Sequence, residues 1–212
     1  LRHFKQVYED AQNILRQPGL PLANEFRIME IQARIRETIY DRKMSEYGRR
    51  DTVLNIIDTC MNWYKNEGIL DYRLWHLAAF ASGSVARTTR SGSPKWLDKY
   101  DRGWTIKACR TAYDELMKIR TDHEKKKEIF PWHREHLLAS IKSNLAYYLA
   151  LGGDLNDIRE GISIHKTSGL AEENLTSTCL HNQGYVWMQK MEYDTDPKAR
   201  EESYKCAKRL FL

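Results

Sequence analysis

The chain has 212 residues, of which 42% are hydrophobic and 30% charged, as is ordinary for a globular protein with a real core. The net charge of +5 comes from 34 basic and 29 acidic residues whose signs are interleaved, which argues against a dedicated nucleic-acid stripe. No apolar run approaches the roughly 20 residues that a membrane-spanning helix needs.

The four cysteines are far apart in the sequence and include no C-x-x-C pair. A disulfide framework would be denser, so we interpret them as reduced, small apolar residues of a cytoplasmic protein. The chain starts at Leu1 without an initiator Met and is still helix-like at Leu212. We therefore expect a piece of a longer multidomain protein.

Gly and Pro are scarce, and Ala, Leu, Arg, Lys and Glu dominate, which favours helix almost throughout. Apolar residues at helical spacing predict helices over about 4–15, 28–39, 53–64, 74–85, 96–120, 137–149, 155–162, 175–187 and 199–211. The sequence thus predicts an all-α protein of about nine helices and no strand. The links are mostly short, so successive helices must pack antiparallel.

A helix-turn-helix pattern recurs at the C-terminal end of the chain. Gly152-Gly153 ends one helix and lets the chain turn into the next. Asn144 and Asn182 occupy like places in two such hairpins, 38 positions apart (182 − 144), and a small residue follows each Asn by two positions. Helical-hairpin repeats have periods of roughly 34 to 47 residues.

This pattern resembles a degenerate tetratricopeptide repeat (TPR) protein, with the best match over residues 134–212. Leu145, Ala146, Ala199 and Cys206 fit the family's large and small positions, whereas Ile158 stands where Ala is usual. The resemblance implies a single domain over residues 1–212, an α-solenoid that winds as a right-handed superhelix. It also implies that the first helix of each hairpin lines a concave groove, which holds a peptide or a partner domain.

In this register the groove-facing, partner-binding candidates are Arg34, Trp75, Asn144, Tyr147, His181, Asn182 and Tyr185. Asn amides can hold a peptide backbone, and Tyr gives contact area at low entropic cost. An equally weighted alternative is that the Asn side chains bridge helices internally. We expect an interaction or sensing scaffold that is not an enzyme and needs no cofactor. Its partner is a protein or peptide, or an adjoining domain of the same protein.

Two other functions stay open. Arg159 and His165 loosely resemble the Arg-x-x-x-x-x-His pair of helical HEPN-type ribonucleases, but a six-residue step places them on different helix faces. Trp96, Tyr100 and Trp104 could stack on bases, within a basic patch over 87–102, although such a stripe is more often part of a core.

His133 and His136 lie three apart, and two ligands alone do not complete a zinc site, so we expect no metal.

Overall fold

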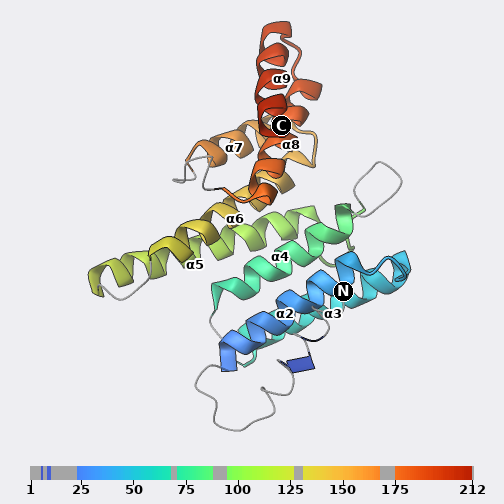
Figure 1. The fold of residues 1–212 in the computed structure, drawn as a ribbon, viewed down its shortest axis with the longest axis vertical. Coiled ribbons are helices and arrows are strands. Elements are labelled where there is room, and N and C mark those ends of the chain that lie inside the picture. The colour runs from blue at the N-terminus through green and yellow to red at the C-terminus, as the bar shows by residue number, and fades with distance from the viewer. Residues whose placement is uncertain are drawn as a thin grey trace. The chain divides into compact units, whose positions relative to one another are not determined.

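The computed structural model describes residues 6, 9–10, 23–67, 71–87, 95–126, 131–167 and 175–211. Within these ranges the chain forms helices and no strand, which confirms the all-α prediction (Figure 1). The helices are α2 (Ala23–Tyr40), α3 (Glu46–Lys65), α4 (Tyr72–Arg87), α5 (Arg102–Lys126), α6 (Pro131–Ala150), α7 (Leu155–Lys166), α8 (Ser177–Tyr193) and α9 (Pro197–Phe211). The helix expected over 4–15 falls mostly outside the described residues. None of the described helices is both long and apolar enough to cross a bilayer.

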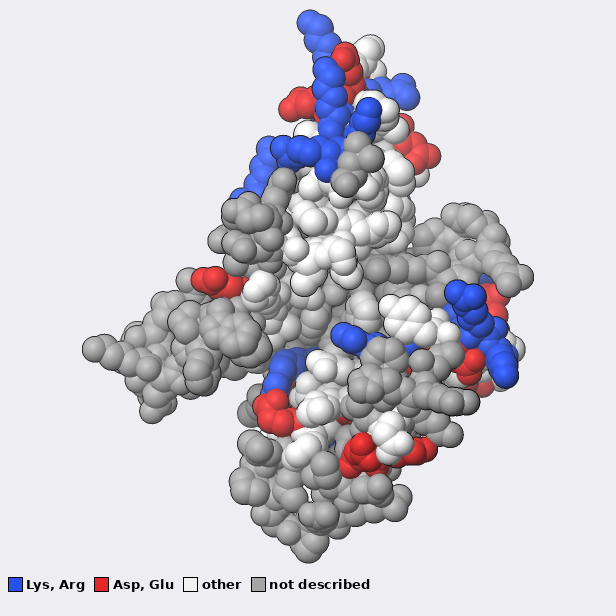
Figure 2. Space-filling model, viewed as in Figure 1, with Lys and Arg blue, Asp and Glu red and all other residues white. Residues whose placement is uncertain are grey.

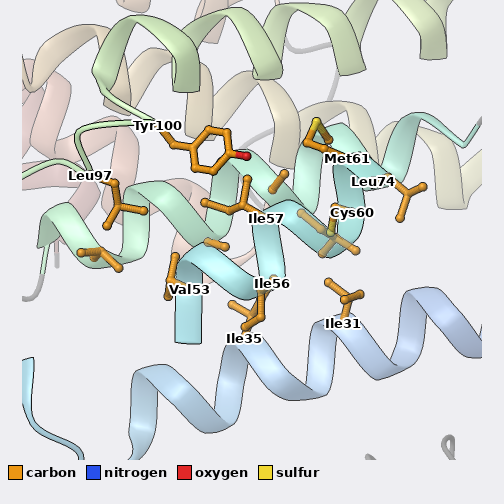
Figure 3. Packing of buried hydrophobic residues seen from close by; sticks show 14 of the residues in the cluster. Ile31, Ile35, Val53, Ile56, Ile57, Cys60, Met61, Leu74, Leu97 and Tyr100 are labelled. Carbon is orange, nitrogen blue, oxygen red and sulfur yellow. The ribbon is translucent and has the colours of Figure 1, made fainter. Parts of the chain in front are cut away.

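The chain divides into two compact units, residues 1–108 and 109–212. In unit 1, helices α2, α3 and α4 pack against one another. Ile31 and Ile35 on α2 point toward Ile56 on α3, and all three side chains are buried (Figure 3). Their spacing of three or four residues places apolar side chains on one helix face, and full burial of each contributes roughly 1.5–3 kcal/mol.

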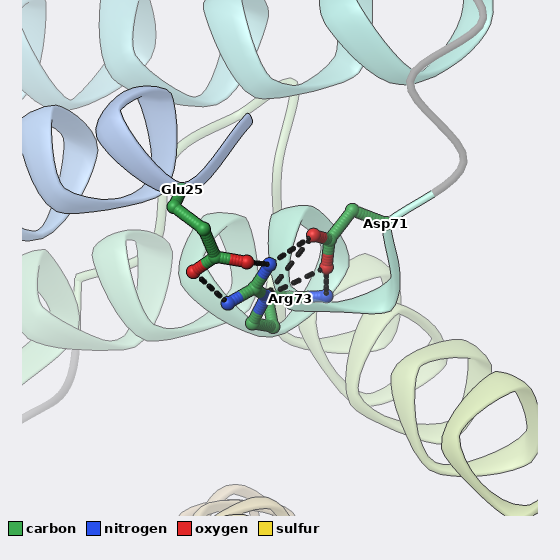
Figure 4. A network of polar contacts seen from close by, with 3 residues as sticks. All are labelled: Glu25, Asp71 and Arg73. Atoms are coloured by element: carbon green, nitrogen blue, oxygen red, sulfur yellow. Dashed lines mark hydrogen bonds and ion pairs between the residues drawn. The ribbon is translucent and has the colours of Figure 1, made fainter. Parts of the chain in front are cut away.

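A polar network joins the beginnings of α2 and α4 in unit 1 (Figure 4). Arg73 donates two hydrogen bonds to the Glu25 carboxylate, at 2.7 and 2.6 Å, and also binds Asp71. The hydrogen bond from Arg73 is the main reason that the pKa of Glu25 lies below its ordinary value. This bidentate pairing fixes the relative position of the two helix starts.

Residues 95–101 are not helical, so the prediction of a helix, or a broken pair of helices, from about 96 to 120 is wrong at its start. α5 begins only at Arg102, because the carboxylate of Asp101 accepts a hydrogen bond from the Trp104 N–H at 2.7 Å and caps the helix there. Arg50 holds the preceding extended segment by donating to the carbonyl oxygens of Lys95 and Trp96.

In unit 2, α6 packs against α7 and α8, and α8 packs against both α7 and α9. Gly153 has a φ of 69°, and the Asp154 side chain then accepts hydrogen bonds from the first N–H groups of α7. The predicted turn is therefore confirmed. A Cβ atom on Gly161 would lie 3.1 Å from the carbonyl oxygen of Ala146, so α6 and α7 approach closely at this point.

Candidate functional site

The structure places three of the predicted groove residues in the interior of unit 2. Asn144 is 4% exposed, Tyr147 is 8% exposed and Asn182 is fully buried. The expectation that these three side chains face an open groove is wrong. The reason is the packing of α6, whose residues 141–150 are all buried, so this helix presents no open face over that length.

The two Asn residues instead join α6 to α8. The Asn182 Nδ2 donates to Asn144 Oδ1 at 3.2 Å and to Ser143 Oγ at 3.1 Å. This arrangement is the internal bridge that the sequence left open as an alternative. The Asn182 Oδ1 is buried and accepts no hydrogen bond within the described part of the chain.

Tyr185 and His181 lie at the surface of α8. His181 is exposed and Tyr185 is partly buried, and Met188 continues the same exposed stripe one turn further along the helix. The Tyr185 ring packs on Tyr147 with its centroid 4.6 Å away. The buried Tyr147 ring therefore supports the partly buried Tyr185 ring.

Arg34 and Trp75 belong to unit 1. Arg34 is partly buried, and it donates from Nη2 to Asn55 Oδ1 at 2.7 Å. Trp75 packs between Tyr64 and Trp104, with ring centroids 5.3 and 6.4 Å away. Its Nε1 is buried without a hydrogen-bond partner among the described residues. Both side chains thus serve contacts within the helices of unit 1.

Sequence reasoning missed two residues at the surface of α9. Tyr204 is 53% exposed and Phe211 is 46% exposed, although both belong to the apolar residues at helical spacing that predict the helix over 199–211. The small residues were the better signal, because Ser203 and Ala207 form the buried face of α9. The Phe211 ring packs against His181, at a centroid distance of 5.5 Å.

These residues form one continuous surface, because α8 and α9 are antiparallel neighbours joined by a short link. From the Phe211–His181 contact, two turns back along α9 lead to Tyr204, and two turns forward along α8 lead to Met188. We define the α8–α9 surface as His181, Tyr185, Met188, Tyr204 and Phe211. Gly184 lies beneath it, because a Cβ atom there would be only 2.8 Å from the Phe211 ring.

The charge beside this surface is unevenly distributed. α9 carries five exposed cations against two exposed glutamates. The cations are Lys198, Arg200, Lys205, Lys208 and Arg209. Figure 2 shows Lys and Arg gathered over α9, with an uncharged area over α8 directly below them. An aromatic, uncharged stripe therefore adjoins a positively charged helix.

Two of the three aromatic residues that the nucleic-acid hypothesis placed against bases belong to the core of unit 1 or pack on it. Tyr100 is 6% exposed and belongs to the buried cluster, and Trp104 packs against that cluster. Lys99 is already paired with Asp58 at 2.6 Å. Burial raises the pKa of Asp58, but hydrogen bonds from Lys99 and Tyr100 outweigh it and hold that pKa below its ordinary value. The side chains of Arg87 and Arg90 lie outside the described residues.

Arg159 and His165 lie in different surroundings. Arg159 is exposed, whereas His165 is partly buried and its Nε2 has no hydrogen-bond partner in the described ranges. Burial lowers the pKa of His165 to about 4. Glu160, which follows Arg159, pairs with Arg110 at 2.7 Å. Nothing in these contacts brings Arg159 and His165 to one reacting atom.

His136 is exposed at the start of α6, and the side chain of His133 is not described. Across the described ranges, no three His, Cys, Asp or Glu side chains are grouped to hold a metal ion. The four cysteines are free, and burial raises the pKa of Cys60 to about 12.

No protein-family model matches this chain, and no curated protein and no solved structure is significantly similar to it.

Proposed function

We propose that this chain is a TPR-like helical-repeat module that binds a segment of a partner protein at the α8–α9 surface. The observation that carries the proposal is the packing of α8. It rests on both helices of the preceding hairpin, α6 and α7, and on α9, yet keeps an exposed stripe without Lys or Arg. Stacked helical hairpins commonly leave one face of each leading helix uncovered for a partner.

The close approach of α6 and α7 also favours a repeat of this kind. A small residue was expected where the two helices of a hairpin meet, and Ala146 takes that place. Gly161 lies opposite it on α7, three positions beyond Ile158. Gly161 thus supplies a small residue near the position where Ile158 departs from the family pattern, which supports the proposal.

The chemistry of the surface suits protein recognition. Tyr and Phe side chains give large contact areas, and Met adapts its shape to different partners. Tyr185 packs on Tyr147, and Phe211 packs on His181. Since these rings are already held in place, a partner that binds there has less side-chain motion to restrict.

Site-specific photo-crosslinking tests the proposal. A photoreactive phenylalanine analogue is placed at Met188, at Tyr204 or, as a control, at Tyr47, which is 75% exposed on α3 in unit 1. We expect discrete cross-linked protein adducts in cells from positions 188 and 204, and none of the same mass from position 47.

The double variant Met188→Asp/Phe211→Asp, carrying the analogue at Tyr204, completes the test. Both residues are partly exposed, so we expect a folded variant with at most a small fall in melting temperature, and the loss of the adducts. Equal adducts from this variant and from the parent would contradict the proposal.

A further inference from the structure

We propose that the partner segment is an acidic amphipathic helix, with apolar side chains against the α8–α9 surface and carboxylates against the cations of α9. This inference rests on the proposed function and adds the chemistry of the partner. It is carried by the juxtaposition of two features, an uncharged aromatic stripe and a helix with an excess of positive charge.

The apolar side of the partner follows from the spacing of the stripe. His181, Tyr185 and Met188 are at positions i, i+4 and i+7 of α8, so they lie along one line parallel to the helix axis. Tyr204 and Phe211 run beside them at i and i+7 on α9. A second helix can pack on such a row of side chains when its own large apolar residues are at i, i+3 or i+4, and i+7.

The acidic side of the partner follows from α9. Of its five exposed cations, Lys205 pairs with Glu201 at 2.7 Å, whereas among the described residues no carboxylate lies within ion-pair distance of Arg200 or Lys208. Both side chains are exposed, at i−4 and i+4 from Tyr204, so they lie on the same helix face as the stripe. Carboxylates on a docked helix would meet this positive potential, which steers association and selects against basic partners.

The test is a selection from a displayed random-peptide library on the immobilised full chain, with Met188→Asp/Phe211→Asp as the counter-selecting surface. Enriched peptides are synthesised, and their dissociation constants are measured by fluorescence anisotropy. We expect peptides with apolar residues at helical spacing flanked by Asp and Glu.

A charge-reversal pair tests the role of the cations on the same peptides. Arg200→Glu/Lys208→Glu should weaken binding by about tenfold at low salt, and the effect should shrink as salt rises. The matched control is Lys65→Glu/Lys118→Glu, which changes the net charge equally at exposed positions of α3 and α5 and should change binding less than about twofold.

The outcomes separate the two proposals. Enriched peptides that are neutral or basic, or a charge reversal without effect, would overturn the acidic partner while the binding surface stands. No enrichment over the counter-selecting variant would overturn both.

Discussion

At the scale of single residues, the buried Asn182 distinguishes a structural role from a binding role. Its side chain is fully buried and bridges α6 and α8 through Asn144 and Ser143. We expect Asn182→Ala to lower the free energy of unfolding by about 1–3 kcal/mol, because two hydrogen bonds are lost inside the protein. Urea denaturation measures this change.

A double-mutant cycle with Asn144→Ala provides the control for this prediction. If the two side chains interact directly, their effects on the free energy of unfolding are not additive, with a coupling of at least about 0.5 kcal/mol. Strictly additive effects would show that the bridge contributes nothing. His181→Ala should leave stability closer to that of the parent, since His181 is exposed.

Glycines give a second contrast at this scale. Gly161→Ala gains helix propensity, but the new Cβ would meet the backbone oxygen of Ala146 at 3.1 Å, and backbone cannot move aside as a side chain can. We expect a net loss of about 1–2 kcal/mol. Gly103→Ala is the control, because its Cβ meets only Asp101 Oδ1 at 3.4 Å, and we expect no loss there. Thermal melting that ranks the two variants equally would contradict the close approach.

The sequence predicted the hydrogen-bonded bridge between Asn144 and Asn182 only as an alternative to a peptide-binding role. An Asn repeated at a fixed place in two hairpins is compatible with a peptide-binding amide and with an internal hydrogen bond. The difference depends on whether a neighbouring helix covers the side chain. For Asn144 and Asn182 that cover comes from residues distant in sequence, so the local pattern could not decide it. Tyr204 and Phe211 illustrate the opposite case, in which periodicity suggested burial and the small residues of α9 took the buried face instead.

At the scale of helices, the sequence predicted the turn between α6 and α7 better than it predicted the residues at which helices begin. Gly153 and Asp154 mark a turn whose backbone requires them, so the sequence predicted the α6–α7 hairpin correctly. α3 begins at Glu46 with Ser45 as its cap, about two turns before Val53, the first residue of its apolar pattern. Trp96, Tyr100 and Trp104 are four residues apart, and this spacing suggested a helix that includes all three. Asp101 caps α5, so the helix does not continue toward Trp96. Local caps override periodicity at such ends.

A buried histidine on α4 makes the stability of unit 1 depend on pH. Burial lowers the pKa of His76 from 6.5 to about 4, so the folded state keeps a neutral imidazole where the unfolded chain is protonated. Stability is therefore full above pH 6.5 and falls as the pH drops toward 4. Between pH 6.5 and 5 we expect a loss of about 2 kcal/mol from this residue.

Denaturation of His76→Gln checks this expectation, because the variant should lose stability less steeply between pH 7 and 5 than the parent does. His136→Gln is the matched control, since His136 is exposed on α6, and it should keep the parental slope. Parental behaviour in His76→Gln would show that this histidine is not the titrating group. Working above pH 5 keeps carboxylates such as Glu25, whose pKa is held low by Arg73, out of the measured range.

At the scale of the whole molecule, the single domain over residues 1–212 stays a prediction, and the chain has two compact units. Each unit has its own cluster of buried hydrophobic residues. Ile56 belongs to the buried cluster of unit 1, and Ile158 belongs to that of unit 2. The helix α5 continues without a break across the boundary between residues 108 and 109. Its first residues therefore belong to unit 1 and the rest belong to unit 2. Repeat proteins often open in such sub-global steps.

Native-state hydrogen exchange determines whether these units open separately. Ile56→Ala and Ile158→Ala remove the same atoms from fully buried sites, and each should cost about 2–5 kcal/mol. We expect Ile56→Ala to reduce amide protection in α3 and α4 while leaving α8 unchanged, and Ile158→Ala to do the reverse, since each side chain belongs to the buried cluster of its own unit. An equal loss of protection in both units from either variant would instead support the single cooperative domain that the repeat pattern suggested. In that case a partner bound at the α8–α9 surface would stabilise unit 1 as well, through the same unfolding equilibrium.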